Sequence, residues 1–254
     1  MKISENGMLK NERHAFIIKQ INLHNKVLSS QLSTQMEVSE DTVRRDLAEL
    51  ADAGLLLKVH GGALSKSYHY LVHQSFVYAQ EKKRIIAGKA VKLIKDGMVI
   101  LTAGGTTMIE MIQLIPEKLE ATFFTVSPLM ALLLAKRPLI TVILLGGEID
   151  HAGQITVGEK TISELSEIKV DLCFLGVNGI NAKNGLTEVD WKVAQIKKAM
   201  IKSASKLAVV TISEKLNSEH KMHLSNINKI DFLITELDPE DQTLAAFGQN
   251  TKIL

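Results

Sequence analysis

Residues 38–47 read Val-Ser-Glu-Asp-Thr-Val-Arg-Arg-Asp-Leu, and they predict the start of a short helix. Ser39 is a good N-cap, because its hydroxyl can accept a hydrogen bond from the backbone N–H of Asp41 or Thr42. The acidic residues Glu40 and Asp41 suit the positive end of the helix dipole. The stretch therefore predicts a helix that begins at Ser39.

The faces of this helix differ in chemistry. Val43, Leu47 and Leu50 recur at helical spacing and form one apolar stripe. That stripe leaves four polar residues on other faces: Asp41, Thr42, Arg44 and Arg45. Gly54 is expected to cap the helix after Ala53. Such a helix can place its first residues at DNA base edges and its arginines at phosphates, but the same ten residues also fit an ordinary amphipathic surface helix.

The residues before this helix predict two further short helices. The apolar spacing of residues 15–21 indicates a first helix that ends near residues 24–25, and residues 27–28 indicate a short extended segment. Ser29 is expected to cap a second helix, whose apolar residues turn inward. Three short helices in about fifty residues match the size of a winged helix-turn-helix domain.

The residues after the helix predict a β-hairpin. An apolar run from Leu55 to Val59 meets the pair Gly61-Gly62 before Ala63, which indicates a small hairpin or wing. Lys58 and His60 could lie near a DNA groove in such a wing. A lone histidine at a strand end is, however, more often a surface or packing residue.

Composition limits what could drive nucleic-acid binding. The chain has 254 residues, enough for one large domain or for a small and a medium one, and 46% of them are hydrophobic. Its formal net charge is +2, and residues 1–62 carry eight basic against eight acidic side chains. Specific contacts, and not bulk attraction, would therefore have to carry DNA binding.

The single cysteine and the histidines give no sign of a disulfide or a metal site. Cys173 lies in an apolar run and has no second cysteine to pair with, which fits a reducing cytoplasm. His220 and His223 come closest to a ligand pair and are expected on a polar helix face. We find no signal peptide and no apolar run long enough to span a bilayer. We therefore expect a soluble cytoplasmic protein with no metal, no cofactor and no membrane partner.

Residues 64–80 contain all three tyrosines of the chain and neither proline nor glycine. A flexible linker has a different composition, so we expect a connector that packs against the second domain or a partner subunit.

From Glu81 onward, helix-like segments alternate with short apolar runs, which is the signature of an α/β sheet flanked by helices. The expected helices are residues 85–95, 107–114, 129–135, 158–168 and 189–203. The expected strands are residues 98–102, 121–126, 140–145, 172–177, 206–211 and 231–234, with residues 252–254 at a sheet edge.

Small polar residues follow several of these strands, and open α/β sheets bind ligands at that edge. The first such loop holds Gly104, Gly105, Thr106 and Thr107. Two glycines let the backbone approach an anion, which threonine hydroxyls and helix-start N–H groups can bind, while a tight structural turn is an equal alternative. Ser127 and Gly179 lie at further strand ends.

Three lysines are candidate cations for this edge. Lys197 and Lys198 lie on one expected helix, and one of them could reach a phosphate as a point charge, whereas the alternative leaves both solvated. Lys215 follows a later strand and is a second candidate.

The motifs combine into one pattern. The N-terminal part reads Arg13-x3-Ile17-x3-Ile21, then seventeen residues, then Ser39-x2-Thr42-Val43-Arg44-Arg45-Asp46-Leu47, Gly54-Leu55 and Val59-His60-Gly61-Gly62-Ala63. The later part includes Ile86-Ala87-Gly88-Lys89-Ala90, Gly105-Thr106-Thr107, Leu144-Leu145-Gly146-Gly147-Glu148, Gly185-Leu186-Thr187 and Ile196-Lys197-Lys198-Ala199-Met200. Over nearly its whole length the chain resembles the DeoR family of bacterial transcriptional regulators.

The resemblance implies an architecture and partners. A winged helix-turn-helix domain, residues 1–63, would bind double-stranded operator DNA. A connector, residues 64–80, would join it to a sensor domain, residues 81–254, similar to ribose-5-phosphate isomerase and glucosamine-6-phosphate deaminase. Such sensors answer to a phosphorylated sugar effector, and the regulators repress catabolic operons as oligomers, so a homo-oligomer, dimer or tetramer, is expected.

The resemblance also assigns site residues. The expected DNA contacts are Ser39, Thr42, Arg44, Arg45, Lys58 and His60. The expected effector contacts are Gly104, Gly105, Thr106, Thr107, Ser127, Gly179, Lys197 and Lys215, with Lys197 at the position of the family's recurrent lysine.

The chain departs from the family pattern at three positions, because Ala103, Val126 and Ile212 replace an aspartate, an asparagine and an aspartate. These changes remove partners for sugar hydroxyls but leave the phosphate-binding elements, so they put the usual effector in question.

Three hypotheses follow. The first is a repressor of a carbohydrate catabolic operon whose operator binding is controlled by a phosphorylated sugar, and which is not an enzyme. The second is a sugar-phosphate isomerase or deaminase, which would need a positioned carboxylate base where Ala103 and Ile212 stand. The third is a DNA-binding protein whose second domain only oligomerises.

Overall fold

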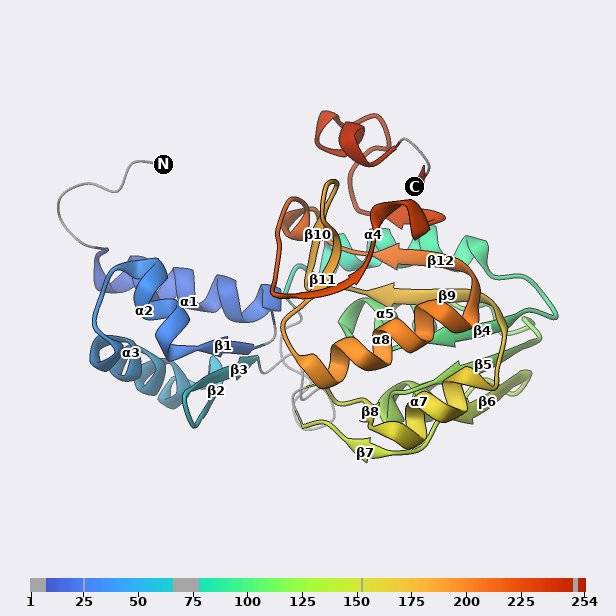
Figure 1. Ribbon diagram of the computed structural model, residues 1–254, viewed down its shortest axis with the longest axis horizontal. Helices are drawn as coiled ribbons and strands as arrows, with labels where there is room; N and C mark the ends of the chain where they lie inside the picture. The colour runs from blue at the N-terminus through green and yellow to red at the C-terminus, as the bar shows by residue number, and fades with distance from the viewer. Residues whose placement is uncertain (1–7, 25, 66–77, 152, 249–250) are drawn as a thin grey trace. The chain divides into compact units, whose positions relative to one another are not determined.

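Figure 1 shows the computed structural model of the chain, which describes residues 8–24, 26–65, 78–151, 153–248 and 251–254. The chain divides into two compact units, Met1–Tyr78 and Ala79–Leu254. Most of the predicted connector, residues 66–77, lies outside the described residues, so its packing stays a prediction.

The first unit is a winged helix-turn-helix fold. Its described elements are α1 (Lys10–His24), β1 (Lys26–Leu28), α2 (Ser29–Met36), α3 (Glu40–Asp52), β2 (Leu56–Val59) and β3 (Gly62–Ser65). The strands pair antiparallel in the order β1-β3-β2. The helices and the sheet share one apolar core: Ile17, Ile21, Val27, Leu32, Met36, Val43, Leu47, Leu50, Leu56 and Ala63. The sequence pattern predicted this unit correctly.

Local details of the first unit differ from expectation in two places. The first helix begins at Lys10, five residues before the apolar spacing starts. The predicted cap at Ser29 is wrong: α2 begins at Ser29, and its N-cap position is Leu28, which makes no side-chain cap bond. Ser29 is buried, and its backbone N–H donates to the carbonyl of Gly61 at 2.8 Å, so the wing satisfies the group that a cap would have satisfied.

The second unit is an α/β domain built on a seven-stranded sheet. Its order is β15-β14-β12-β9-β4-β5-β6, and every neighbouring pair is parallel. The strands are β4 (Val99–Thr102), β5 (Ala121–Thr125), β6 (Ile140–Leu144), β9 (Val170–Gly176), β12 (Ala204–Val210), β14 (Phe232–Ile234) and β15 (Lys252–Ile253). The predicted α/β alternation is thus confirmed.

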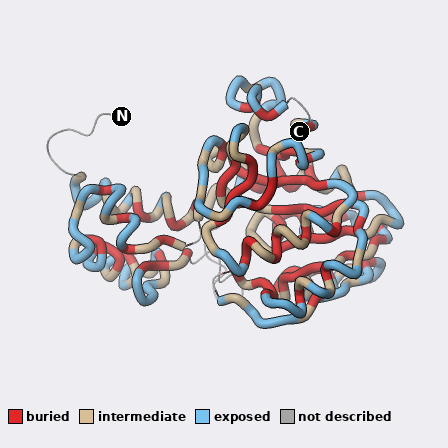
Figure 2. The backbone as a smooth tube through the Cα atoms, in the orientation of Figure 1, coloured by how far each residue is buried: buried red, intermediate tan, exposed pale blue. Residues whose placement is uncertain are grey.

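Helices cover both faces of this sheet, as parallel sheets require. They are α4 (Gln80–Ala90), α5 (Thr106–Gln113), α6 (Pro128–Leu134), α7 (Glu159–Ser166) and α8 (Trp191–Ser203). Helix α5 packs against α4 and α6, while α7 and α8 pack together on the other face, in front of the sheet in Figure 1. Figure 2 shows the buried backbone concentrated in the sheet between the two layers.

Short elements complete the unit. The 3-10 helices are η2 (Val91–Leu93), η3 (Ser213–Lys215), η4 (Ile227–Lys229) and η5 (Gln242–Phe247). A two-stranded sheet joins β7 (Glu148–Ile149) to β8 (Thr156–Val157), and β10 (Gly179–Asn181), β11 (Gly185–Glu188) and β13 (Met222–Ser225) form an antiparallel sheet. The expectation that His220 and His223 mark a helix face is wrong, because His223 lies in β13 and pairs with β11, and His220 lies in the loop before it.

The strand order places a switch point between β4 and β9. From β4 the chain moves outward to β5 and β6, whereas β9, β12, β14 and β15 follow on the other side. Ligands of open α/β sheets bind beyond the carboxyl ends of the strands at such a point. The loops after β4 and β9 are therefore the first place to look for a site.

No helix in the described part of the chain is long and apolar enough to cross a membrane. No group of three or more His, Cys, Asp or Glu side chains in the described ranges is placed to hold a metal ion.

Candidate functional site

Helix α3 has the predicted start. The Ser39 hydroxyl accepts a hydrogen bond from the Thr42 backbone N–H at 3.2 Å and lies 2.9 Å from the Thr42 hydroxyl. Val43, Leu47 and Leu50 are buried, as the apolar stripe predicts. The polar face of α3, opposite this stripe, therefore lies at the surface.

The two arginines of α3 are exposed and already face a carboxylate. Their side chains are 62% and 79% exposed, for Arg44 and Arg45, and they lie 3.6 and 2.9 Å from the two Asp41 carboxylate oxygens. Exposed ion pairs of this kind contribute only about 0–1 kcal/mol. A DNA phosphate or a base edge can therefore replace Asp41 at small cost.

A buried ion pair joins α3 to α1. Asp46 accepts from the Arg13 guanidinium at 2.7 and 3.1 Å, and the His14 ring lies 3.2 Å away. Burial acts to raise the pKa of Asp46, but the hydrogen bonds and charges of Arg13 and His14 outweigh it, so this pKa lies below its ordinary value. The pair explains why Arg13 and Asp46 belong to the same sequence pattern: it sets the position of α3 on α1.

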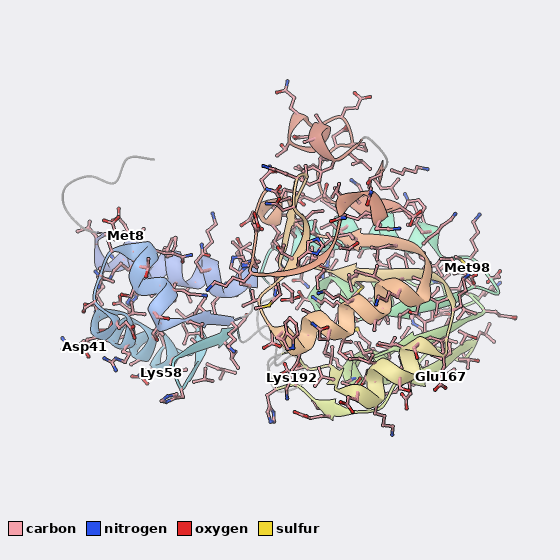
Figure 3. The ribbon with its side chains drawn as sticks, in the orientation of Figure 1. Met8, Asp41, Lys58, Met98, Glu167 and Lys192 are labelled. Atoms are coloured by element: carbon pink, nitrogen blue, oxygen red, sulfur yellow. The ribbon has the colours of Figure 1, made fainter. Side chains whose placement is uncertain are left out.

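The wing residues lie near α3 or at the turn. The Lys58 ammonium is 3.5 Å from the Arg44 carbonyl oxygen. Figure 3 shows Lys58 and Asp41 at the surface of the first unit. His60 is exposed in the turn between β2 and β3. The DNA-binding role of all six residues stays a prediction, but Lys58, Arg44 and Arg45 share one region of this unit.

In the second unit, the loop after β4 has the geometry of a glycine turn before a helix. Gly105 has φ +124°, which residues with a side chain rarely adopt, and α5 begins at Thr106. The first backbone N–H groups of a helix have no acceptor within it and attract anions. Gly104, Gly105, Thr106 and Thr107 are all partly exposed.

Two other residues that we expected to contact the effector, Ser127 and Gly179, have structural roles. Ser127 is buried, and its hydroxyl accepts from the Met130 N–H at 3.5 Å as the N-cap of α6. A Cβ on Gly179 would lie 2.7 Å from the Thr187 hydroxyl and 2.9 Å from the Ser218 carbonyl oxygen. Close packing therefore accounts for the glycine, and the predicted effector contacts of Ser127 and Gly179 stay predictions.

Lys197, which we expected to be a point charge for phosphate, has a buried carboxylate partner in this structure, and its effector contact stays a prediction. Its side chain is 11% exposed, and its ammonium hydrogen-bonds the Glu188 carboxylate, which is 2% exposed. Glu188 also accepts from the Asn178 amide and, at 2.8 Å, from the Val189 N–H. Burial acts to raise the pKa of Glu188, but the Lys197 charge and these hydrogen bonds lower it below its ordinary value.

The charges of Lys197 and Glu188 act on a further lysine, Lys215. Lys215 donates to the Val177 carbonyl at 3.1 Å, beyond the end of β9. Burial, then the charges of Lys83 and Lys197, lower the pKa of Lys215 to about 7, against the opposing effect of Glu188. Burial lowers the pKa of Lys83 to about 8, opposed by Glu110 and Glu214. The charges of Lys83 and Lys197 thus both act on Lys215, and we call Lys83, Lys197 and Lys215 the lysine cluster.

Sequence reasoning missed Lys83, Glu188 and Asn178. Lys83 could have been found, because it begins a helical spacing that continues at Ile86, Ala87 and Ala90, all buried. Glu188 ends a strand whose four residues are all buried, but that strand is too short for the sequence to reveal. Cys173 is buried, and burial raises the pKa of its thiol, so it has no nucleophilic role here.

Comparison with known families matched both units. A family model described as the DeoR C-terminal sensor domain matches residues 78–237, and one described as the DeoR-like helix-turn-helix domain matches residues 13–68.

Curated relatives align over most of the chain. The HTH-type transcriptional repressor GlcR of Bacillus subtilis is 30% identical over 91% of this chain and 90% of its own length. The glycerol-3-phosphate regulon repressor of Escherichia coli is 28% identical over 91% and 93%. The lactose phosphotransferase system repressor of Staphylococcus epidermidis is 37% identical over 70% and 72%.

Solved structures are more distant. Ribose 5-phosphate isomerase A from Neisseria gonorrhoeae is similar with a TM-score of 0.41 and 17% identity over 55% of this chain and 54% of that one. The translation initiation factor eIF-2B of Pyrococcus horikoshii is similar with a TM-score of 0.47 and 14% identity over 90% and 82%.

Proposed function

The chain belongs to the DeoR family of transcriptional regulators, and on that premise we propose that it represses a carbohydrate catabolic operon in response to a phosphorylated sugar. The sensor would bind the sugar phosphate at the carboxyl edge of the seven-stranded sheet. The winged helix-turn-helix unit would bind operator DNA through α3. The protein is a DNA-binding regulator, and the effector and its contacts are the proposed part.

One observation carries the effector proposal. Within the lysine cluster, Lys215 donates to the carbonyl of Val177 directly after β9, and β9 pairs with β4, whose loop leads into α5. Ammonium groups and helix-start N–H groups are the two kinds of donor that phosphate esters use most. Two of the relatives carry names with glycerol-3-phosphate and a phosphotransferase system, which supports a phosphorylated ligand.

The ion pair of Lys197 with Glu188 bears on which residues would contact the phosphate. Because Lys197 is held by Glu188, Lys215 is the candidate cation for a phosphate. Glu188 and Asn178 add a carboxylate and an amide to a site where Ala103 and Ile212 had removed carboxylates. These two groups are the candidates for recognising sugar hydroxyls.

The enzyme alternative now has one observation in its favour, the buried carboxylate of Glu188. A general base must be free to take a proton near neutral pH. Glu188 instead has a lowered pKa, and its two oxygens accept bonds from Lys197, Asn178 and Val189. That arrangement favours a binding role over turnover, and a coupled assay with aldose and ketose phosphates would reveal any saturable turnover.

We also propose a homo-oligomer in the cytoplasm. A symmetric dimer would present two copies of α3 to operator half-sites about 34–36 Å apart. The first unit is nearly neutral, so one copy of α3 has little non-specific electrostatic attraction for DNA. Binding through two copies of α3 in a dimer would raise the affinity. Light scattering of the purified chain with and without DNA measures the number of subunits.

The decisive experiment links ligand to DNA. An operator is first selected by the purified full chain from random duplexes, and its affinity is measured by fluorescence anisotropy at fixed salt. A panel of sugar phosphates is then screened by thermal shift, with the unphosphorylated sugars as matched controls. We expect one phosphorylated sugar to raise the melting temperature and to change operator affinity. If no phosphate ester does either, the second domain is an oligomerisation domain and the effector proposal is wrong.

A further inference from the structure

Strand β6 ends the seven-stranded sheet on one side, as Figure 1 shows. Among the described residues its one strand neighbour is β5. The Leu145 N–H donates to the Thr125 carbonyl of β5 at 2.9 Å, and the backbone groups of successive residues point to opposite sides of a strand. The N–H and C=O groups of Val142 and Leu144 therefore point away from β5, where another strand can bond them.

The sequence of β6 does not protect this edge. Natural edge strands are commonly very short, or they carry charged residues or proline, and these features prevent pairing with another chain. The opposite edge of the sheet follows that rule, because β15 has two residues and one of them is the exposed Lys252. Strand β6 has five residues, Ile-Thr-Val-Ile-Leu, and none is charged or a proline. It has the composition of a strand that a partner covers.

Apolar side chains gather around β6. Five large hydrophobic residues between positions 132 and 149 have exposed fractions of 38–61%, and we call them the β6 edge: Leu132, Leu139, Ile143, Leu144 and Ile149. Leu132 lies on α6, which packs against β6, and the adjacent Ile143 and Leu144 point to opposite faces of the sheet. Five such half-exposed side chains offer about 400 Å², and the apolar part of a standard interface needs about that area on each partner.

The charges at the two ends of β6 have opposite signs. Lys136 and Arg137 precede the strand, and Glu148 and Asp150 follow it. Lys136 and Glu148 are exposed, and the 2.9 Å ion pair of Glu148 with Lys192 is exposed as well, so it contributes only about 0–1 kcal/mol. An antiparallel pair of two β6 strands brings the basic end of each copy to the acidic end of the other. A parallel pair would bring like charges together, which is unfavourable.

We propose that β6 binds a second copy of this chain, in an antiparallel pair of β6 strands about a two-fold axis at Val142. Each Val142 then faces the partner's Val142, and each Leu144 N–H donates to the carbonyl of the partner's Ile140. The two seven-stranded sheets become one continuous sheet, and the two-fold axis covers both β6 strands at once. This inference rests on the proposed function in one respect, since it names the surface through which the proposed homo-oligomer forms.

A cysteine at the axis tests the register. In the proposed pair the two Val142 Cα atoms lie about 5.5 Å apart, within the range of a disulfide, whereas the two Thr141 Cα atoms lie more than about 7 Å apart, outside it. Full-length Val142→Cys and Thr141→Cys are incubated with oxidised glutathione and compared on non-reducing gels. The single native cysteine, Cys173, is buried, and the parent chain controls for it. We expect a covalent dimer from Val142→Cys and little from Thr141→Cys.

A charge placed on the β6 edge tests the apolar contact. Leu144 is 44% exposed, so a lysine fits there in one copy, but in the pair Leu144→Lys places an ammonium group in the interface twice. Sedimentation velocity over a concentration series measures the dissociation constant, and thermal melting checks that the fold is kept. We expect the dissociation constant to rise by about tenfold or more. Ile85→Lys makes the same exchange at a 50% exposed residue of α4 and, as the matched control, should leave it unchanged.

The contrary outcomes separate this interface from the homo-oligomer itself. If Leu144→Lys associates as tightly as the parent, or if the two cysteine variants cross-link equally, β6 is not the interface, while the proposed homo-oligomer stands. Assemblies that keep growing with concentration would overturn the closed two-fold pair. A parent that stays monomeric at every concentration and on operator DNA would refute the homo-oligomer and this inference with it. The cross-linking result holds whether or not Leu144→Lys folds.

Discussion

Replacing Lys215 by methionine should stabilise the second unit and damage its response to ligand at the same time. The Lys215 ammonium is desolvated, lies near the positive charges of Lys83 and Lys197, and has a pKa of about 7 where a free lysine has 10.5. Its hydrogen bond to the Val177 carbonyl, at 3.1 Å, is the contact that the substitution removes. Methionine has a similar length and no charge to bury.

The size of the effect follows from the pKa. Because the folded pKa lies below the unfolded one, the unfolded chain binds more protons between pH 7 and pH 10.5, and the stability of the parent rises with pH through that window. The cost of Lys215 to the folded state is about 4 kcal/mol at pH 7 and about 2 kcal/mol at pH 9. The lost hydrogen bond offsets about 1 kcal/mol. Lys215→Met should therefore gain about 3 kcal/mol at pH 7 and about 1 kcal/mol at pH 9.

The assay is urea unfolding followed by tryptophan fluorescence. Trp191 is the single tryptophan of the chain and lies at the start of α8, so its signal reports on the second unit. Parent and variant are compared at pH 7 and pH 9 with the slope of the transition checked for constancy. Lys221→Met, at an exposed lysine, is the control and should change stability little at either pH. A variant less stable than the parent at pH 7, or a gain that is equal at both pH values, would refute the reasoning.

Three further predictions concern charged contacts. Arg45→Ala should weaken operator binding by about 1–3 kcal/mol in anisotropy titrations, as the loss of a base contact does. Asp46→Asn should destabilise the first unit by about 3–5 kcal/mol in urea denaturation, because it leaves the Arg13 guanidinium without its carboxylate. Since the folded pKa of Asp46 is lowered, this stabilisation is present above the unfolded pKa and is lost in acid as the pH falls through the folded pKa. Lys197→Met should destabilise the second unit by a similar amount, because it strands the buried Glu188.

Matched controls accompany these variants. Lys19→Ala removes an exposed charge from α1 and should leave sequence-specific operator affinity nearly unchanged. The double variant Lys197→Met, Glu188→Leu should recover most of the stability that Lys197→Met loses. An Asp46→Asn protein as stable as the parent at pH 7, or a double variant no better than the single one, would contradict the account of these buried pairs.

The N-terminal unit could be predicted from sequence because its signals are local. The Ser39 cap, the Val43 to Leu50 stripe and the Gly61 turn each depend on residues within one helix or hairpin. The cap at Ser29 failed for the opposite reason. Its backbone N–H is satisfied by Gly61, which is far away in sequence and near only because β1 pairs with β3.

The large parallel sheet could also be predicted, but the small antiparallel one could not. Strands β10, β11 and β13 have three or four residues each, and β13 lies more than thirty positions after β11. A Cβ on Gly185 would lie 2.1 Å from the Ser225 carbonyl oxygen, so glycine is required by a partner that no local pattern reveals. His223 was misjudged because the strand that holds it exists only through this pairing.

The strand-end position of the candidate residues could be predicted from sequence, but the ion pairing among them could not. The glycine loop and Lys215 follow strands, and strand ends can be read from sequence. Lys197 of α8 is paired with Glu188 of β11, so a residue of another element neutralises its charge. Pairing between elements decides which lysine can serve a ligand, and it has no sequence signature.

The near-neutral charge of the chain has a counterpart in both units, where neighbouring groups reduce the effective charge of a cationic side chain. On α3, Asp41 lies against Arg44 and Arg45, which lowers attraction for any polyanion but costs little when a fitted operator displaces it. In the second unit, burial, and then the charges of Lys83 and Lys197, lower the pKa of Lys215 to about 7 against the opposing effect of Glu188. A lysine with an ordinary pKa would be charged whether or not a ligand is bound. A dianion that restores the charge of Lys215 gains binding free energy that a sugar without phosphate cannot gain, and this difference is what a sensor needs in order to distinguish the two.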